Sequence, residues 1–547
     1  MKSTRRGWPM LAFVAVGSAA VMGVAMPTGL LAAQVSSPAK KVEKPLPDGE
    51  HPSLAVKGHL FDRQSVYAFL TTAKQAEAMA DPLQRCLKYP DPPGSHWSAV
   101  AVEAYCRYRT HQVAPFEEVR SLLQRGEFDE LERRLASLLQ DKLNKPDMRN
   151  VLDHSFERWF ARSDLELRPL LENWKHAKSQ SAFAYAASGI SYVAMAQQAR
   201  GGQYIKDTPA SNIEAMDRLI ALADVDLRHA VELDSRVTPA YVAMIRAGRY
   251  SLGDAYLEKA AGAALRADPA NFAIYDELMW ALQPKWGGSL KQMTLLGKQA
   301  IKHAGENPVL LLLPEKELAY EADLDSDDCT KPGRWDQFSV IFDQAAVTSQ
   351  LLDAGTAAAR CGQLELSVVY YSEALRFYPE DDDTRVARAN QLSDFDESAW
   401  ALKEIGHLLL QKPHEARYVF ARGYAYEGLN DYTNAEKDYL AALALDPGNQ
   451  TIYAQLAGLY VNDMHDWEKA WKLDERLVEL YPNEPYVWLL RAHIQQEQPR
   501  PGLKDTADYF QAHFDKSPEL HQALLKMRAA QALQEGKAHA AAKATGQ

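Results

Sequence analysis

The sequence contains none of the short motifs that mark the common catalytic and nucleotide-binding classes. It has no GxxxxGK[ST] segment and no GxGxxG after a strand, which argues against a nucleotide site. It has no HExxH pair, and its 15 histidines are scattered, so a zinc hydrolase is not indicated. A GxSxG nucleophile elbow is also missing. The sequence therefore predicts no catalytic residue, no metal site and no cofactor, and we expect a protein that is not an enzyme.

Positive charge is in short supply. The chain carries 61 Lys and Arg against 73 Asp and Glu, a net charge of -12, and no basic block reverses that balance. Because an acidic surface repels phosphate backbones, nucleic acid is not an expected partner. The acidic run 380–383 lacks the alternating spacing and terminal Glu of an EF-hand, so we expect it to supply negative charge at a helix N-terminus.

Cysteine is rare: the chain has only Cys86, Cys106, Cys329 and Cys361. None forms a CxxC pair, so redox catalysis and zinc binding have no support. Their even number fits an oxidising compartment. Pairing sequence neighbours, Cys86 with Cys106 and Cys329 with Cys361, is the simplest of three connectivities, and four free thiols are the alternative.

A long apolar run occurs only at the N-terminus. Basic residues precede the run 10–26, and Leu31-Ala32-Ala33 offers a small-residue cleavage site, so residues 1–33 are predicted to be a signal peptide. No Cys follows the run, which excludes a lipoprotein. We expect an exported protein, periplasmic or secreted.

Two alternatives to a cleaved Sec signal remain open. Residues 4–8 resemble a twin-arginine signal, although Pro9 departs from that pattern. The run could also stay uncleaved and anchor the chain in the inner membrane, but it is short for a span of about 20 residues. No later segment is apolar enough to cross a membrane, so membrane contact is expected only through this end.

Strand-like alternation is missing from the rest of the chain. Residues 34–57 are rich in Pro and charge and have no periodic apolar face, which is typical of a linker. Beyond them most segments have helical periodicity. In residues 128–139, for example, Phe128, Leu131, Leu135 and Leu138 recur at spacings of three and four. The sequence predicts an all-α fold.

The C-terminal half is repetitive. Pro379, Pro413 and Pro447 recur at one constant interval, and Pro482 follows one residue later than that interval would place it. Small residues stand twelve positions before each proline: Ser367, Ala401, Ala435 and Ala470. A second small position, in the first helix of each pair, holds Gly355, Ala389, Gly423 and Gly458. Small residues let paired helices touch, and Pro stops the second helix.

This pattern, with its period of about 34 residues, resembles the tetratricopeptide repeat (TPR) family. The resemblance covers about residues 348–484 as four copies, with a degenerate fifth from Pro485 onward. It implies a right-handed helical-hairpin solenoid, a TPR-like superhelix. Two departures occur: no copy has the aromatic residue of the fourth position, and Asp474 replaces a large apolar residue in the fourth copy.

The upstream half repeats less regularly. Residues 230–234 and 264–269 are similar and lie one such period apart, which predicts irregular hairpins over about residues 115–310. With Trp174 and residues 199–201, the segment 284–289 (PKWGGS) resembles a bacterial family of exported or envelope proteins of unknown function. That resemblance implies a fold and a location but no activity.

The turn within this segment consists of Trp286, Gly287, Gly288 and Ser289. Ser289, with Gln292 three residues on, is a good N-cap, and the glycines permit a tight turn before it. We interpret the turn as structural. The alternative is that backbone amides of the glycine pair face a ligand at the following helix N-terminus.

The domain organisation expected from these patterns has six parts. They are a signal peptide (1–33), a Pro-rich linker (34–57), a helical cap (58–114), an irregular helical-repeat domain (115–335), a TPR array (336–520), and a C-terminal helix with a flexible tail (521–547).

In the TPR family the first helix of each pair lines a concave groove. Carried onto this chain, the groove positions are Asn390, Arg417, Phe420, Tyr424, Glu427, Gln455, Asn462 and His493. Such side chains suit a protein or peptide partner. The carboxylate clamp of chaperone-type members is disfavoured, because Val386 stands where Lys is needed. The mixed charges of His154, Glu157 and Arg158 are interpreted as a solvated helix face.

Together these patterns predict an exported TPR scaffold or adaptor that binds a protein partner in the cell envelope. Two alternatives make the half before the array an enzyme or a glycan-binding module, with the repeats as a recruiting arm. The 11 Trp and 25 Tyr motivate glycan binding. The periodic placement of Tyr371, Tyr426, Tyr432 and Tyr439 favours burial instead.

Overall fold

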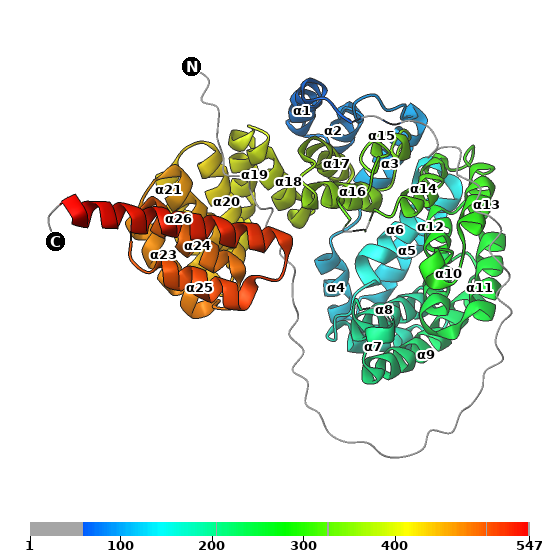
Figure 1. Ribbon diagram of the computed structural model, residues 1–547. Coiled ribbons are helices and arrows are strands. Elements are labelled where there is room, and N and C mark those ends of the chain that lie inside the picture. Colours follow the sequence, from blue (N-terminus) through cyan, green and yellow to red (C-terminus); the bar gives the residue numbers. More distant parts are fainter. Residues whose placement is uncertain are drawn as a thin grey trace, which may run out of the picture. The chain divides into compact units, whose positions relative to one another are not determined.

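The computed structural model describes residues 58, 60–203, 205–324, 326, 328–498 and 500–544 (Figure 1). The predicted signal peptide and linker, residues 1–57, lie outside this part of the chain. Within it the chain forms 26 α-helices, joined by short 3-10 helices and π turns, and no strand. The all-α, helical-hairpin prediction is confirmed. None of the described helices has the length and apolar character that crossing a membrane requires.

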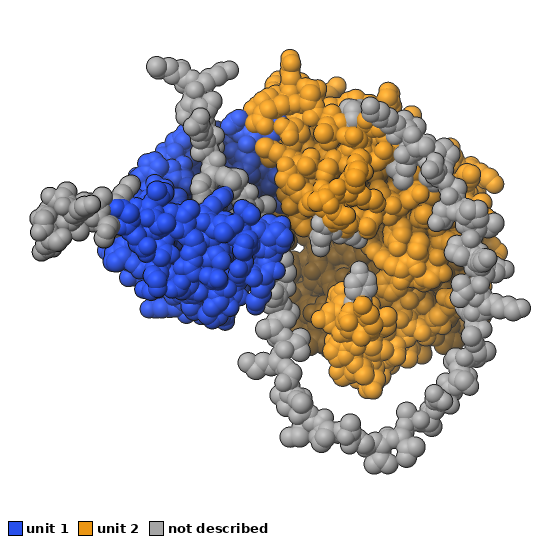
Figure 2. All heavy atoms as spheres, in the orientation of Figure 1, with its two compact units in different colours: residues 1–41, 385–547 blue, residues 42–384 orange. Residues whose placement is uncertain are grey.

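The chain divides into two compact units, drawn in different colours in Figure 2. Among the described residues, unit 2 covers the chain up to residue 384, and unit 1 covers the chain from residue 385 onward. The division falls inside α18 (Asp382–Asp394), so the first repeat hairpin belongs to unit 2 and the later ones to unit 1. The domain boundaries expected from the sequence stay predictions.

Unit 2 begins with three helices and continues with a run of antiparallel pairs. Its α-helices are α1 (Arg63–Glu77), α2 (Pro82–Lys88), α3 (Ala99–Thr110), α4 (Phe116–Arg125), α5 (Phe128–Asn144), α6 (Val151–Phe160), α7 (Leu167–Ala177), α8 (Ala182–Arg200), α9 (Ala210–Leu233), α10 (Thr238–Ala247), α11 (Asp254–Ala267), α12 (Phe272–Ala281), α13 (Leu290–Ile301), α14 (Glu315–Glu321), α15 (Phe338–Ile341), α16 (Thr348–Arg360) and α17 (Leu364–Phe377). Short turns between them are η1 (Pro146–Met148), η2 (Ile205–Asp207), η3 (Gly248–Leu252), η4 (Pro284–Trp286) and η5 (Pro308–Leu312).

Unit 1 consists of successive hairpins. After α18 come α19 (Ser398–Gln411), α20 (Ala416–Gly428), α21 (Tyr432–Leu445), α22 (Gln450–Gly458), η6 (Leu459–Asp463), α23 (Trp467–Leu480), α24 (Pro485–Glu497), α25 (Leu503–Phe514) and α26 (Pro518–Ala544). Consecutive helices pack on each other, as α20 does on both α19 and α21.

Helix burial follows the sequence pattern in part. In α5 the predicted positions Leu131 and Leu135 are buried, whereas Phe128 and Leu138 are half-buried and the neighbouring Leu139 is buried instead. In the repeats, Ser367, Ala401, Ala435 and Ala470 are all fully buried. Each second helix ends two residues before its proline, as α21 does at Leu445. Proline cannot continue a helix, so this spacing sets the hairpin length.

Two disulfides lie in unit 2, and no cysteine is free. Cys86–Cys106 joins α2 to α3, with Cα atoms 5.7 Å apart. Cys329–Cys361 ties the loop before α15 to the end of α16, with Cα atoms 5.4 Å apart. Each bridge pairs sequence neighbours, so the structure adopts one of the three connectivities.

Candidate functional site

The first helices of the repeat hairpins carry the eight predicted groove residues, all of them in unit 1. Asn390 is on α18; Arg417, Phe420, Tyr424 and Glu427 are on α20; Gln455 is on α22; Asn462 is in η6; and His493 is on α24.

Four of these residues form one connected patch. The ring of Phe420 stacks near Tyr424, with centroids 6.4 Å apart and planes at 18°. Both oxygens of Glu427 accept from Gln455 Nε2, at 2.9 and 3.0 Å. Tyr439 is buried on α21 and links the aromatic pair to the Glu427–Gln455 pair. Its ring lies 5.5 Å from that of Phe420, and its hydroxyl donates to Glu427 at 2.6 Å. We call Phe420, Tyr424, Glu427 and Gln455 the repeat face.

The repeat face is polar and acidic at one end. Burial raises the pKa of Glu427; the hydrogen bonds from Gln455 and Tyr439 oppose that rise, and the nearby charges of Asp463 and Asp394 add to it. The hydroxyl of Tyr424 also donates to Asp394. An aromatic pair beside carboxylates can stack on a partner's apolar groups and pair with its cations.

Asp394 and Tyr439 also contact this patch, and neither is among the predicted groove positions. Asp394 precedes Asn462 by two repeat periods, so the register used for Asn462 could have found it. Tyr439 is on a second helix, which the groove pattern does not cover. Its burial agrees with its periodic placement in the sequence, but its contacts with Phe420 and Glu427 depend on packing between helices.

The other four predicted residues are Asn390, Arg417, Asn462 and His493, which are not part of the contacts that define this patch. Arg417 is exposed and pairs with Glu415 at 3.3 Å. Asn462 is exposed in a π turn, a local change of helical register that is frequent at functional sites. The His493 ring lies 6.0 Å from Trp467, and burial lowers its pKa.

Asn390 is half-buried. Its Oδ1 atom is buried and has no hydrogen-bond partner among the residues that the structure describes. Leaving such an acceptor unpaired costs free energy, so this is a position where a bound donor would be favourable.

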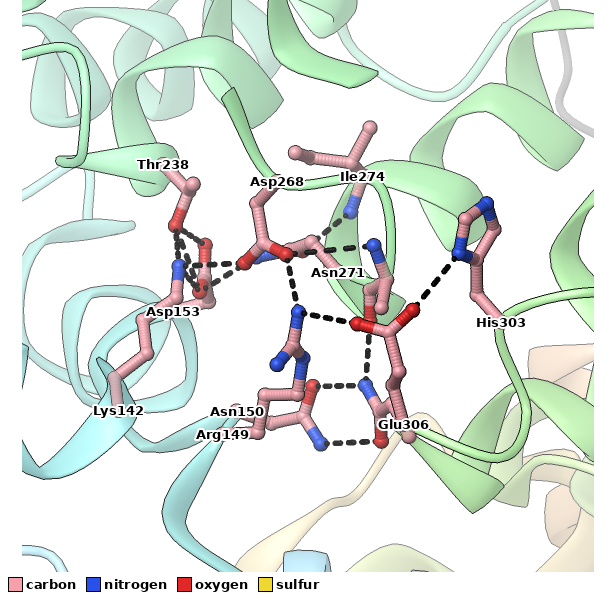
Figure 3. A network of polar contacts seen from close by, with 12 residues as sticks. Lys142, Arg149, Asn150, Asp153, Thr238, Asp268, Asn271, Ile274, His303 and Glu306 are labelled. Carbon is pink, nitrogen blue, oxygen red and sulfur yellow. Dashed lines mark hydrogen bonds and ion pairs between the residues drawn. The ribbon is translucent and has the colours of Figure 1, made fainter. Parts of the chain in front are cut away.

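Unit 2 contains a buried polar network of a different character (Figure 3). Lys142 Nζ donates to Asp153 at 3.1 Å and lies 3.2 Å from Asp268 Oδ2. Thr238 accepts from Lys142 and donates to Asp153, and Asn271 donates to Asp153 at 3.0 Å. Burial opposes ionisation of Asp268, but the charges of Lys142 and Arg149 outweigh it, so its pKa is lowered.

The network continues toward the surface through Arg149, which donates to Asp268 at 3.0 Å and lies 3.6 Å from Glu306. Asn150 and Asn307 exchange side-chain hydrogen bonds of 3.1 and 2.9 Å. These residues come from α5, α6, the start of α10 and the loops that follow α11 and α13. The network therefore ties helix ends together, which is a structural role.

The turn at residues 286–289 is well packed. Trp286 lies under the guanidinium of Arg249, 4.9 Å from the ring centroid, and its ring meets Tyr250 edge-on at 5.8 Å. Gly287 has φ of 92°, a left-handed conformation that favours glycine. Ser289 accepts from the backbone of Gln292 at 3.3 Å, which caps α13. These contacts fit the structural interpretation of the turn.

The predicted solvated face on α6 is only partly correct. Glu157 and Arg158 are exposed, but His154 is only 5% exposed. The prediction is wrong for His154 because α3 packs over that side of α6, placing Tyr108 5.0 Å from the imidazole. Nowhere in the described chain do three or more His, Cys, Asp or Glu residues gather in a way that could hold a metal ion.

Two family models match the chain. Residues 416–449 match a tetratricopeptide repeat model, and residues 116–258 match a domain of unknown function, DUF4034. Both resemblances drawn from the sequence are thereby confirmed: TPR in the C-terminal half and a family of unknown function in the N-terminal half. No curated protein matches the chain.

Solved structures similar to the chain include three helical-repeat proteins. A tetratricopeptide repeat protein from Parabacteroides merdae has 15% identity and a TM-score of 0.32, over 50% of this chain and 92% of that chain. Yeast Tom70 has 12% identity and a TM-score of 0.32, over 77% and 95%. A chain of the APC/C Cut9–Hcn1 hetero-tetramer has 12% identity and a TM-score of 0.28, over 86% and 96%.

A TPR-like helical-repeat fold is an architecture of protein-interaction scaffolds, which typically bind protein partners and are generally non-enzymatic.

Proposed function

We propose that this protein is an exported TPR scaffold that binds a segment of a protein partner through the repeat face and the groove positions around it. The observation that carries the proposal is the connected patch of Phe420, Tyr424, Glu427 and Gln455. Aromatic and Arg side chains dominate the binding energy of protein interfaces, and Arg417 stands one helical turn before Phe420.

The backbone behind the repeat face is held rigidly, which favours binding. Tyr439 is fully buried between Phe420 and Glu427. Arg422 on the same helix pairs with Asp438 on α21, at 2.7 Å. A preorganised face loses little conformational entropy when a partner binds.

Export is supported by the predicted signal peptide and by two disulfides, which persist in oxidising compartments. The partner would then be a protein of the cell envelope. The proposal assigns no catalytic residue, and membrane contact is expected only if the N-terminus stays uncleaved.

Affinity capture from native envelope extract tests the binding proposal. We compare the tagged full chain with a triple variant, Arg417→Ala, Phe420→Ala and Tyr424→Ala. Removing interface aromatic and Arg side chains costs about 1–4 kcal/mol each, so a protein captured by the wild type should be lost. Circular dichroism of the variant should keep the wild-type helical signal.

The matched control is Lys437→Ala with Leu440→Ala, two exposed positions on the second helix α21. This variant should capture the same protein as the wild type. If the triple variant captures that protein equally well, the repeat face is not the binding site.

A separate experiment tests export. Fractionation of the native cell should place the protein outside the cytoplasm, and N-terminal sequencing should begin after Ala33 if the signal is cleaved. Recovery of the protein in the cytoplasm would contradict the export proposal and leave the binding proposal standing.

A further inference from the structure

Three consecutive first helices of unit 1 end in carboxylates next to the repeat face. α18 ends at Asp394, Glu427 is in the last turn of α20, and η6 ends at Asp463. The fold brings them together, because Tyr424 of α20 donates to Asp394 and the charges of Asp394 and Asp463 both act on Glu427. We call Asp394, Glu427 and Asp463 the acidic edge.

The backbone makes the acidic edge more negative. The carbonyl groups at the C-terminus of a helix carry a partial negative charge, which a basic side chain in the last turn stabilises and a carboxylate does not. No basic residue stands in the last turn of α18, α20 or η6. The chain therefore places carboxylates where its own helices favour cations, and a cation from another molecule would offset both charges.

Glu427 is held in one orientation without being neutralised. Its carboxylate accepts from the Tyr439 hydroxyl at 2.6 Å and from Gln455 Nε2 at 2.9 and 3.0 Å, and both donors are uncharged. Within the described chain it forms no ion pair with a Lys, Arg or His side chain. Because Glu427 is only half-buried, this oriented carboxylate is accessible to a partner. Partial burial without a cation costs free energy, which a bound cation would recover.

The surface of α20 changes in character along the helix. Arg417 lies in the first turn and pairs with Glu415 at 3.3 Å, whereas Glu427 lies in the last turn. Between them are the rings of Phe420 and Tyr424, stacked with their planes at 18°. An aromatic ring beside a carboxylate attracts a cation through its face as well as through ion pairing. The end of α20 at Glu427 is therefore complementary to a basic side chain.

We propose that the partner segment bound by the repeat face carries a basic side chain, lysine or arginine, which pairs with Glu427 at the acidic edge and packs against the Tyr424 ring. This inference rests on the proposed function and adds the chemistry of the partner. The same charges disfavour a partner that presents a carboxylate to this end of the groove.

Fluorescence polarisation with the full chain tests the charge requirement. The probes are three labelled, end-blocked peptides of equal length: one alternates arginine with alanine, one has lysine in place of arginine, and one has the uncharged analogue citrulline. A basic peptide should bind saturably, and the citrulline peptide at least about tenfold more weakly. The tighter of the two basic peptides identifies the cation. Equal binding of the citrulline and arginine peptides, or no saturable binding of either basic peptide, overturns the proposal.

Variants locate the cation at the acidic edge. Glu427→Gln keeps the size of the side chain and removes its charge, and should weaken binding of the basic peptides about tenfold or more. If circular dichroism shows that Glu427→Gln loses its helical signal, the pair Asp394→Asn with Asp463→Asn provides the same test. That pair should weaken binding about tenfold and reduce its dependence on salt.

The matched control is Glu479→Gln, which removes the same charge from an exposed position on the second helix α23. Its affinity for the basic peptides should stay within about twofold of the wild type, well under the tenfold effect expected at the acidic edge. Wild-type affinity in both acidic-edge variants would show that the cation binds elsewhere and would overturn the proposal.

The capture experiment separates this inference from the proposed function. If the triple variant loses the captured protein and Glu427→Gln retains it, the repeat face binds a partner without a cation, and only this inference falls. Loss of the protein from both variants supports both proposals. If the triple variant retains the protein, the proposed function falls, and the inference about its partner falls with it.

Discussion

The guanidinium of Arg422 on α20 donates to both oxygens of Asp438 on α21, at 2.7 and 2.8 Å. Arg388 and Glu404, each one repeat period earlier, form the same ion pair between α18 and α19. Because a bidentate Arg–carboxylate pair fixes geometry as well as charge, the sequence repeat is also a repeat of one cross-helix contact. The neighbours of Arg422 and Asp438, Gly423 and Tyr439, pack directly against each other in this hairpin.

Replacement of Gly423 by Ala should destabilise unit 1. A Cβ atom at residue 423 would lie 2.8 Å from the Tyr439 ring, so the helices must move apart. We expect a loss of about 1–3 kcal/mol in the free energy of unfolding, measured by urea unfolding followed by circular dichroism.

Gly406→Ala is the matched control, because Gly406 lies within α19 and has no atom within 4 Å of its Cβ position. There Ala should stabilise the helix by about 0.5–1 kcal/mol. Equal effects of the two substitutions would mean that the hairpin register is wrong.

Replacement of Lys142 by Met should strongly destabilise unit 2. The Lys142 side chain is 3% exposed and lies between Asp153 and Asp268. Removing it leaves the buried carboxylate of Asp153 without its cation and that of Asp268 with Arg149 alone, which costs about 3–5 kcal/mol. The melting temperature of the variant should fall accordingly in a thermal scan.

Lys178→Met is the control for this effect. Lys178 also pairs with an Asp, but that partner, Asp129, has a side chain that is 92% exposed. Exposed pairs contribute about 0–1 kcal/mol, so this variant should melt close to the wild type. A similar melting temperature for both variants would mean that the network around Lys142 is solvated.

Asp474 should make unit 1 relatively more stable in acid. Its side chain is fully buried against Arg491, at 2.7 Å, and burial outweighs that charge and raises the pKa of Asp474 to about 6. A carboxyl group with a raised pKa contributes stability that is fully present below its ordinary value of 3.8 and lost as pH rises through about 6.

Comparison with Asp474→Asn isolates this contribution, because the amide of Asn does not titrate. Between pH 4 and pH 7.5, the free energy of unfolding of the wild type minus that of the variant should fall by about 2–3 kcal/mol. The measurement is urea unfolding at several pH values. If this difference in the free energy of unfolding does not change with pH, the pKa of Asp474 is not raised and its side chain is not buried as described.

Periodic features could be predicted from the sequence because they arise within one hairpin. Pro447 predicts where a helix ends, and Ala435 predicts where two helices touch. The structure confirms both, since α21 ends two residues before Pro447 and Ala435 is fully buried. Local chemistry also sufficed at Ser289, which caps α13. His154 shows the limit of this reasoning. The polar residues of its own helix predicted that it is exposed to solvent, but Tyr108 of α3, distant in the sequence, packs against it and it is buried.

The sequence by itself determined the all-α class, the hairpin length and the positions where helices touch, since propensity, proline and small residues act locally. Only the tertiary structure decided which side chains meet. Lys142 pairs with Asp153 and Asp268, although the segments that carry these three residues are not related by the repeat. Glu427 accepts hydrogen bonds from Tyr439 and Gln455, which lie on two other helices. The tertiary structure also decided which of the three disulfide connectivities forms. Such contacts depend on how non-repeating segments pack, and neither composition nor spacing records that.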